Sequence, residues 1–167
     1  MNNIVQDDFY LEEDTQKDKY LIFNLGNEFY GIEIKNVIEI IGMQPITPVP
    51  ELPEYINGII NLRGKIIPVM DVRTRFKMPK IEYDDRTCII VVDVDDISIG
   101  LIVDIVAEVI TIEEENIVLP PENTRKYNRY IKGIGKLNNE VRLLLDCHKL
   151  LTEDELESLE SVEEALE

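Results

Sequence analysis

Few side chains in this sequence have the type and spacing that catalysis requires. The single histidine, His148, directly follows Cys147, and neighbours on a strand point to opposite faces, so the two cannot act together as base and nucleophile. Serine occurs only at positions 98, 158 and 161, and none lies in a G-x-S-x-G turn. The segment 133–136, GIGK, lacks the remaining spacing of a phosphate-binding loop. The sequence therefore predicts a protein that is not an enzyme.

Metal and cofactor binding are not predicted either. Cys147 and His148 have no second Cys or His at ligand spacing, and the acidic groups at 93–96 and 113–115 lack the order of an EF-hand loop. Cys88 and Cys147 lie in strand-like runs and are interpreted as small buried apolar side chains in a reducing compartment. We expect no metal and no cofactor.

The side chain best suited to recognition is Arg63. It begins the turn Arg63-Gly64-Lys65 between two apolar runs, Ile56 to Leu62 and Ile66 to Val72, a pattern that predicts a β-hairpin. Pro68 cannot donate to a sheet, so the second strand is expected to lie at an edge or to be bulged there. An arginine at an exposed tip can give a partner a charge-assisted hydrogen bond. The alternative is a surface arginine paired with a neighbouring carboxylate, which contributes little.

The hairpin belongs to a segment that occurs twice. Tyr55 to Arg75 aligns without gaps on Tyr130 to Leu150, and Arg63-Gly64 then falls on Asn138-Asn139, a pair suited to a tight turn. Earlier segments repeat as well, because Gly31 aligns with Gly100. The sequence therefore predicts two copies of one β-rich unit, about 20–76 and about 88–150. Four or five short strands per unit favour closure into a small barrel.

Helices are predicted at two places. Residues 34 to 41 carry apolar side chains at i, i+3, i+4 and i+7 and are followed by Gly42, which predicts a short helix although its β-branched content argues against one. Residues 152–167 form a second predicted helix, which begins with the capping pair Thr152 and Glu155. Its apolar stripe is expected to dock on the core, and the alternative is that it is offered to a partner.

The charge distribution excludes several classes of partner. The formal net charge is −17, and most of it lies in an acidic tail at the N-terminus, expected to be flexible over 1–18, and in the acidic segment 152–167. Nucleic acids and anionic membrane surfaces require clustered Lys and Arg and are therefore disfavoured. No apolar run is long enough to span a bilayer, and the acidic N-terminus does not resemble a signal peptide. We expect a soluble cytoplasmic protein.

The stretch NLRGKIIPVMDVR, preceded by YGIEIKNVIEI and by VPELPEYINGI, closely resembles the CheW family of bacterial chemotaxis adaptors. The resemblance covers residues 19–151. It implies a mainly β (α+β) fold of two SH3-like five-stranded β-barrel subdomains with short helices, in agreement with the internal duplication. It also implies a non-enzymatic adaptor that couples the cytoplasmic hairpin tips of chemoreceptors to the regulatory domain of the histidine kinase CheA, in arrays beneath the inner membrane. The alternative is a CheW-like barrel acting in a related pilus or surface-sensing pathway.

The resemblance also implies which residues contact the receptor. Positions of the family's receptor-binding surface fall in the segment predicted as a short helix, in the central hairpin and in the strand that opens the second half. The matching residues are Val37, Glu39, Gly58, Arg63 and Ile89. No individual residue is assigned to the CheA-binding surface.

Overall fold

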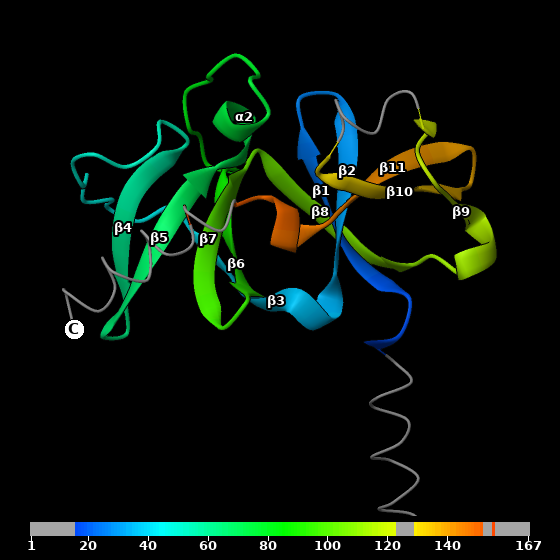
Figure 1. The fold of residues 1–167 in the computed structure, drawn as a ribbon, viewed down its shortest axis with the longest axis horizontal. Helices are drawn as coiled ribbons and strands as arrows, with labels where there is room; N and C mark the ends of the chain where they lie inside the picture. Colours follow the sequence, from blue (N-terminus) through cyan, green and yellow to red (C-terminus); the bar gives the residue numbers. More distant parts are fainter. Residues whose placement is uncertain (1–15, 123–128, 152–154, 156–167) are drawn as a thin grey trace, which may run out of the picture.

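The computed structural model describes residues 16–122, 129–151 and 155. Within these residues the chain is mainly β and forms two sheets that lie beside one another (Figure 1). The predicted fold class is thereby confirmed. The six-stranded sheet has the order β8 (Ile105–Thr111), β1 (Lys19–Leu25), β2 (Glu28–Glu33), β11 (Glu140–Leu145), β10 (Ile131–Leu137), β9 (Ile117–Val118). The five-stranded sheet has the order β3 (Val37–Gly42), β6 (Cys88–Val94), β7 (Ile97–Val103), β5 (Lys65–Asp71), β4 (Ile56–Leu62).

Each sheet takes strands from both halves of the chain. The hairpin β1–β2 belongs to the six-stranded sheet, but the next strand, β3, pairs with β6 of the second half. Reciprocally, β8 leaves the hairpin β6–β7 and pairs with β1. The expectation that segments 20–76 and 88–150 each close into their own barrel is therefore corrected. Apolar alternation shows which face of a strand is buried, but it does not show which strand lies beside it.

The internal duplication itself is visible in fine detail. Gly31 lies opposite Leu144 in the parallel pair β2–β11, and Gly100 lies opposite Val69 in the equivalent pair β7–β5. The hairpins also have β-bulges at equivalent points. One lies between Ile56 and Gly58 in β4, and the other lies between the matching residues Ile131 and Gly133 in β10. Main-chain bonds repeat too: the Asp71 N–H donates to Tyr55 O and the Asp146 N–H to Tyr130 O, each over 2.8 Å.

The predicted short helix over residues 34–41 is wrong. A single 3₁₀ turn, η1 (Ile34–Asn36), is followed by strand β3, whose register against β6 shifts between Val37 and Glu39. This bulge places one extra residue, Ile38, in the strand, and the apolar spacing then mimics a helical period. The β-branched side chains, which pack well on a pleated surface, indicate the strand correctly.

Pro68 lies on an interior strand, so the expectation of an edge strand is also wrong. Strand β5 is flanked by β4 and β7, and the bulge of this hairpin lies in β4. The main-chain N–H of Ile59, the partner of Pro68, donates to Thr47 O, and the Ile59 carbonyl accepts from the Thr47 N–H. Because Ile59 makes no main-chain bond to Pro68, the nitrogen of Pro68 faces the β7 side. Pairing with β7 begins only at Val69, and no ladder bond is lost.

The core consists of three groups of buried side chains. The largest lies between the two sheets and includes Phe23, Met70 and Leu101. A second group, which includes Ile67 and Ile89, fills the five-stranded sheet, and a smaller one fills the six-stranded sheet. Three short helices connect the strands: α2 (Val72–Arg75), η2 (Glu114–Asn116) and η4 (Cys147–Lys149). Helices α2 and η4 are preceded by the equivalent residues Asp71 and Asp146, whose carboxylates accept main-chain N–H bonds at the start of each helix. Residues 1–15 of the predicted tail (1–18) and the predicted C-terminal helix (152–167), except Glu155, lie outside the described residues.

Candidate functional site

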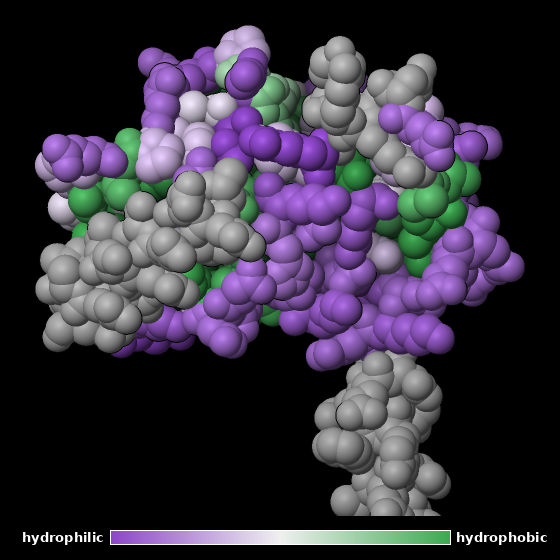
Figure 2. All heavy atoms as spheres, in the orientation of Figure 1, coloured by the Kyte–Doolittle hydropathy of each residue, from purple (hydrophilic) through white to green (hydrophobic). Residues whose placement is uncertain are grey.

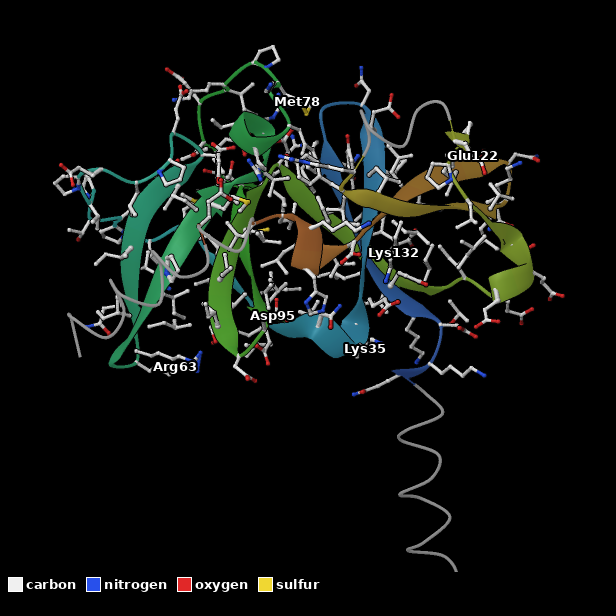
Figure 3. All side chains as sticks on the ribbon, viewed as in Figure 1. Lys35, Arg63, Met78, Asp95, Glu122 and Lys132 are labelled. Carbon is white, nitrogen blue, oxygen red and sulfur yellow. The ribbon has the colours of Figure 1, made fainter. Side chains whose placement is uncertain are left out.

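One end of the five-stranded sheet brings together an exposed cation and exposed apolar side chains. The turn of hairpin β4–β5 carries Arg63 at this end (Figure 3), and edge strand β3 carries Ile38, Glu39 and Ile40. We refer to these four residues as the β3–tip surface. Strand β3 pairs with β6 on one side only, so its outer side faces away from the sheet. The hairpin turn and the edge strand together position this surface.

The turn that carries Arg63 is tight and fixed. Arg63 and Gly64 both have positive φ, +53° and +87°, as the mirror-image hairpin turns require. The Gly64 N–H donates to Asn61 Oδ1 over 2.8 Å, and Lys65 Nζ donates to Ser98 Oγ on β7 over 2.9 Å. Arginine accepts positive φ only at a cost of about 1–2 kcal/mol. The predicted position of Arg63 at the hairpin turn is confirmed.

Arg63 is paired with Glu39. Its Nη2 donates to Glu39 Oε2, which joins the hairpin turn to β3. The side chain of Arg63 is 69% exposed and that of Glu39 is 30% exposed. The pairing expected of an ordinary surface arginine is thus present, but it uses one nitrogen of a guanidinium that has five N–H donors. The remaining donors are accessible to a partner's carboxylate or carbonyl group.

Two isoleucines beside this ion pair were missed by the sequence reasoning. Ile38 is 53% exposed and Ile40 is 45% exposed, and both lie on β3 on either side of Glu39. The prediction of a helix concealed them, because it grouped Ile38 with the buried stripe. Read as a strand, the alternation along 37–42 places them on the face opposite to Glu39 and Ile41, and Ile41 packs inward.

Gly58 is buried, so it fixes how the strands are arranged and is not itself part of the exposed surface. Its φ is +149°, and a Cβ atom built on it would lie 2.1 Å from the carbonyl oxygen of Thr47. The close approach lets Thr47 and Ile59 exchange two main-chain hydrogen bonds of 2.9 Å each. The bridge ties the connector after β3 to β4 and closes the five-stranded sheet on itself. Only glycine meets both requirements at this position.

Ile89 and Val37 support β3 from inside. Ile89 is fully buried and lies opposite Ile41 in the β3–β6 pair. Val37 is half-buried and packs against the core between the sheets. The structure therefore brings Arg63 and Glu39 together at the surface and places Gly58 and Ile89 beneath it. The buried side chain of Ile89 can act on a partner only through the strand that it supports.

A second exposed apolar group lies at the other end of the molecule. Val118, the last residue of β9, is 41% exposed, Leu119 directly after it is 68% exposed, and Val141 on β11 is 50% exposed. Hydrophobic surface is visible at the end of the six-stranded sheet where β9, β10 and β11 lie (Figure 2). The β10–β11 turn beside them borders an open hollow of about 250 Å³ lined by residues 136–141. We refer to Val118, Leu119 and Val141 as the β9–β11 surface.

The described residues contain no group of three or more His, Cys, Asp or Glu side chains that could hold a metal ion. Within the same part of the chain, no helix is long and apolar enough to cross a membrane. The β3–tip surface consists of one ion pair and exposed apolar strand residues. Such groups can make the charged and apolar contacts of a protein–protein interface.

Comparisons with known proteins agree with this chemistry. Residues 19–155 match the family model for the CheW-like domain. The chain is 36% identical over 153 residues to the chemotaxis protein CheW of Klebsiella aerogenes, which covers 91% of this chain and 92% of that protein. It is 35% identical over 142 residues to CheW of Treponema pallidum, covering 82% and 84%. The crystal structure of the scaffolding protein TtCheW from Thermoanaerobacter tengcongensis is similar with a TM-score of 0.77 at 40% identity, covering 83% of this chain and 94% of that one.

Proposed function

Because the chain belongs to the family of CheW-like domains, we propose that it is a chemotaxis scaffold protein without enzymatic activity. It couples the cytoplasmic hairpin tips of chemoreceptors to the regulatory domain of the kinase CheA. It does so in the cytoplasm, in receptor arrays beneath the inner membrane. The observation that carries this proposal is the Arg63–Glu39 pair on one face of edge strand β3, with Ile38 and Ile40 exposed on its other face, so that a partner lying along this edge can contact both.

The β3–tip surface fits a helical partner. A receptor tip is a helical hairpin that presents an apolar seam flanked by polar side chains, and such a seam is recognised by apolar burial with a few directed polar contacts. Ile38 and Ile40 supply the apolar area, since about 45–53% of each side chain is still open to solvent. Arg63 supplies a charge-assisted hydrogen bond to a receptor carboxylate or carbonyl group. Glu39 holds the guanidinium in place until the partner arrives.

The other implied receptor residues contribute indirectly. Gly58 permits the Thr47–Ile59 bridge, and Ile89 packs beneath Ile41, so both fix the position of β3. Val37 anchors the start of the same strand in the core. Substitutions at these three positions are expected to weaken receptor binding by moving the edge strand. A direct contact by the side chain of Ile89 is not part of the proposal, since that side chain is fully buried.

The kinase is assigned to the β9–β11 surface. A scaffold that holds two partners at once needs two separate surfaces, and this one lies at the opposite end of the molecule from Arg63 (Figures 2 and 3). Val118, Leu119 and Val141 are exposed there. Burial of such a patch gives a negative heat-capacity change on binding. This surface is an exposed apolar group that the proposed receptor contact does not use.

The test compares two equivalent hairpin turns. Arg63→Asp should weaken binding to a soluble cytoplasmic receptor fragment by about 1.5–3 kcal/mol, the contribution of a hydrogen bond to a charged group. Asn138→Asp, at the matching turn of the second repeat, should leave receptor binding unchanged. Isothermal calorimetry with the receptor fragment and with the CheA regulatory domain measures both affinities. CheA binding should survive in Arg63→Asp.

Two results would contradict the proposal. If wild-type protein shows no heat with either partner at high micromolar concentration, the scaffold function is wrong. If Arg63→Asp weakens binding to both partners equally, Arg63 is a structural residue and the β3–tip surface is not the receptor site. Circular dichroism of each variant separates these cases from a loss of fold.

A further inference from the structure

The hydroxyl of Tyr83 joins the two strands of hairpin β4–β5 at the end opposite to its turn. Tyr83 lies in the inter-repeat connector 76–87, between α2 and β6. Its hydroxyl donates to Asp71 Oδ2 over 2.6 Å and accepts from Asn57 Nδ2 over 2.8 Å. Asn57 belongs to β4 and Asp71 is the last residue of β5, so one connector side chain holds both strands. We refer to Tyr83, Asn57 and Asp71 as the Tyr83 latch.

The central bond of the latch is made to a buried carboxylate. Asp71 is only 5% exposed, and its other oxygen, Oδ1, accepts the Thr74 N–H over 3.3 Å. Burial and then the hydrogen bond with Asp71 raise the pKa of the Tyr83 phenol, so the hydroxyl remains a donor at neutral pH. A buried acceptor that loses its donor is costly, and more so when it is charged. The Tyr83 hydroxyl therefore cannot leave Asp71 without a large loss of stability in this region.

The connector that carries Tyr83 is itself held in place on both sides of it. Before Tyr83, the carbonyl oxygen of Pro79 accepts from Arg73 Nη1 over 3.0 Å. After Tyr83, the Asp84 N–H donates to Thr87 Oγ1 over 2.9 Å, and the Thr87 N–H donates to Asp84 Oδ1 over 3.2 Å. These bonds close the turn that leads into β6. Tyr83 is thus presented by an ordered segment, which reduces the entropy lost when its hydroxyl bonds are made.

Asn57, the other partner of Tyr83, is the extra residue of the bulge in β4. The register against β5 shifts between Ile56 and Gly58, so Asn57 has no partner of its own in the ladder. The next residue, Gly58, lies against the main chain of Thr47, and the residue after that, Ile59, exchanges two main-chain hydrogen bonds of 2.9 Å with Thr47. The latch therefore holds the bulge directly beside the bridge that ties the connector after β3 to β4.

The second repeat bonds the matching positions differently. Lys132 stands where the first repeat has Asn57, and its Nζ donates to Glu33 Oε1 on β2. Asp146 stands where the first repeat has Asp71, and it accepts a main-chain N–H at the start of η4. In the part of the chain that the structure describes, a hydroxyl that joins these two positions thus occurs in the first repeat, which is the repeat that carries the β3–tip surface.

We propose that Tyr83 is a positioning residue for the β3–tip surface. Its hydroxyl holds the β4 bulge at Asn57, the bulge holds the bridge between Thr47 and Ile59, and the bridge holds edge strand β3 beside the hairpin turn. Tyr83 contacts no partner in this role and acts only through the strands that it fixes. What the surface binds rests on the proposed function, whereas the mechanical link from Tyr83 to the bridge does not.

The first measurement is amide hydrogen exchange of the full-length protein. Tyr83→Phe removes one oxygen atom and keeps the ring. The amide N–H groups of Thr47 and Ile59, which form the bridge, should then exchange about tenfold faster, the factor expected for the loss of one hydrogen bond to a charged group. Amides of β10 and β11 should keep their rates. Tyr130→Phe is the matched control, because it removes a hydroxyl whose exposed bond from Arg129 (2.7 Å) lies outside the latch.

The second measurement is binding, followed by calorimetry with a soluble cytoplasmic receptor fragment and with the CheA regulatory domain. Receptor affinity of Tyr83→Phe should fall by about threefold or more, because binding is reduced by the fraction of molecules that keep the competent arrangement. CheA affinity should stay unchanged. Asn57→Leu should weaken receptor binding as well, and the double variant should lose less than the product of the two factors, since both changes break one network.

Each outcome decides for or against the positioning role. Faster exchange at Thr47 and Ile59 with unchanged β10 and β11, together with a loss of receptor affinity alone, supports it. Equal acceleration in β10 and β11, or in Tyr130→Phe, would show a general loss of stability and overturn it. Unchanged exchange at the bridge, or faster exchange with unchanged receptor affinity, would overturn it too. If the wild-type protein binds no receptor fragment, the proposed function is wrong, and the exchange rates alone then decide whether Tyr83 holds the bridge.

Discussion

Replacing Gly58 by alanine should destabilise the protein far more than the same change at Gly133, its equivalent in the second repeat. At Gly58 the new Cβ would lie 2.1 Å from Thr47 O and 2.8 Å from its carbonyl carbon, and φ is +149°. At Gly133 the nearest atom is the Cγ2 of Ile117, at 2.8 Å, which belongs to a side chain that can move. Main-chain atoms that bridge two segments cannot move without breaking the bridge.

The magnitude follows from three contributions. A non-glycine residue in this region of φ costs about 1–3 kcal/mol. Displacing Thr47 breaks its two main-chain hydrogen bonds to Ile59, at about 0.5–1.5 kcal/mol each. Alanine also lowers the conformational entropy of the unfolded chain, which offsets about 0.4–1 kcal/mol of this loss of stability. We therefore expect the free energy of unfolding to fall by about 1–5.5 kcal/mol for Gly58→Ala, and by less for Gly133→Ala, where only a movable side chain is in the way.

Urea denaturation followed by far-ultraviolet circular dichroism measures both variants. The transition midpoint of Gly58→Ala should fall by about 1 M or more, with an unchanged slope. Receptor affinity of the folded fraction should fall as well, because the connector and β3 shift together. A loss below about 1 kcal/mol at Gly58, or an equal loss at Gly133, would refute the argument from main-chain proximity.

Two further predictions concern titratable groups. Burial opposes ionisation of Asp104, but hydrogen bonds from Arg73 (2.6 and 2.8 Å) and from the Gly26 N–H (2.8 Å) lower its pKa in the folded protein. The stability that these bonds contribute is fully present above the pKa of the carboxyl in the unfolded chain. It is lost as the pH falls through the lower pKa of Asp104 in the folded protein. Asp104→Asn should lower stability at pH 7 by about 1.5–3 kcal/mol and flatten the acid side of a melting-temperature profile, and an unchanged profile would contradict this. Burial raises the pKa of Cys147 to about 12, so its thiol should resist a disulfide reagent at pH 8 until the protein unfolds. Labelling of Cys147 as fast as that of an unfolded control would contradict its burial.

The sequence predicts those parts of the fold that are set by short-range chemistry. The turn residues Arg63-Gly64 and Asn138-Asn139 indicate two hairpins at the correct positions, and all four residues adopt positive φ as expected. The exposed position of Arg63 follows from the same argument. Its pairing with Glu39 does not, because 24 residues separate them and their contact depends on how β3 is placed beside the hairpin turn.

The remaining features depend on long-range packing. The bulge at Ile38 changes the strand period, so a local pattern alone predicts a helix and conceals two exposed isoleucines. Ile89 was expected at a receptor-binding surface, but it lies on β6 between β3 and β7, and its side chain is fully buried in the core of the five-stranded sheet. Such burial cannot be read from one strand's own alternation when both of its faces are apolar.

The exchange of strands between the halves has a consequence for the origin of the molecule. In each repeat the strand after the first hairpin, β3 or β8, pairs with a strand of the other repeat. One repeat alone could therefore complete its sheets only by intertwining with a second copy. Joining two copies in one gene converts such a symmetric dimer into one polypeptide. In a single polypeptide the two equivalent hairpin tips need not be identical, and here one carries Arg63-Gly64 while the other carries Asn138-Asn139. Gene fusion thus gives one polypeptide two ends that can evolve toward different partners.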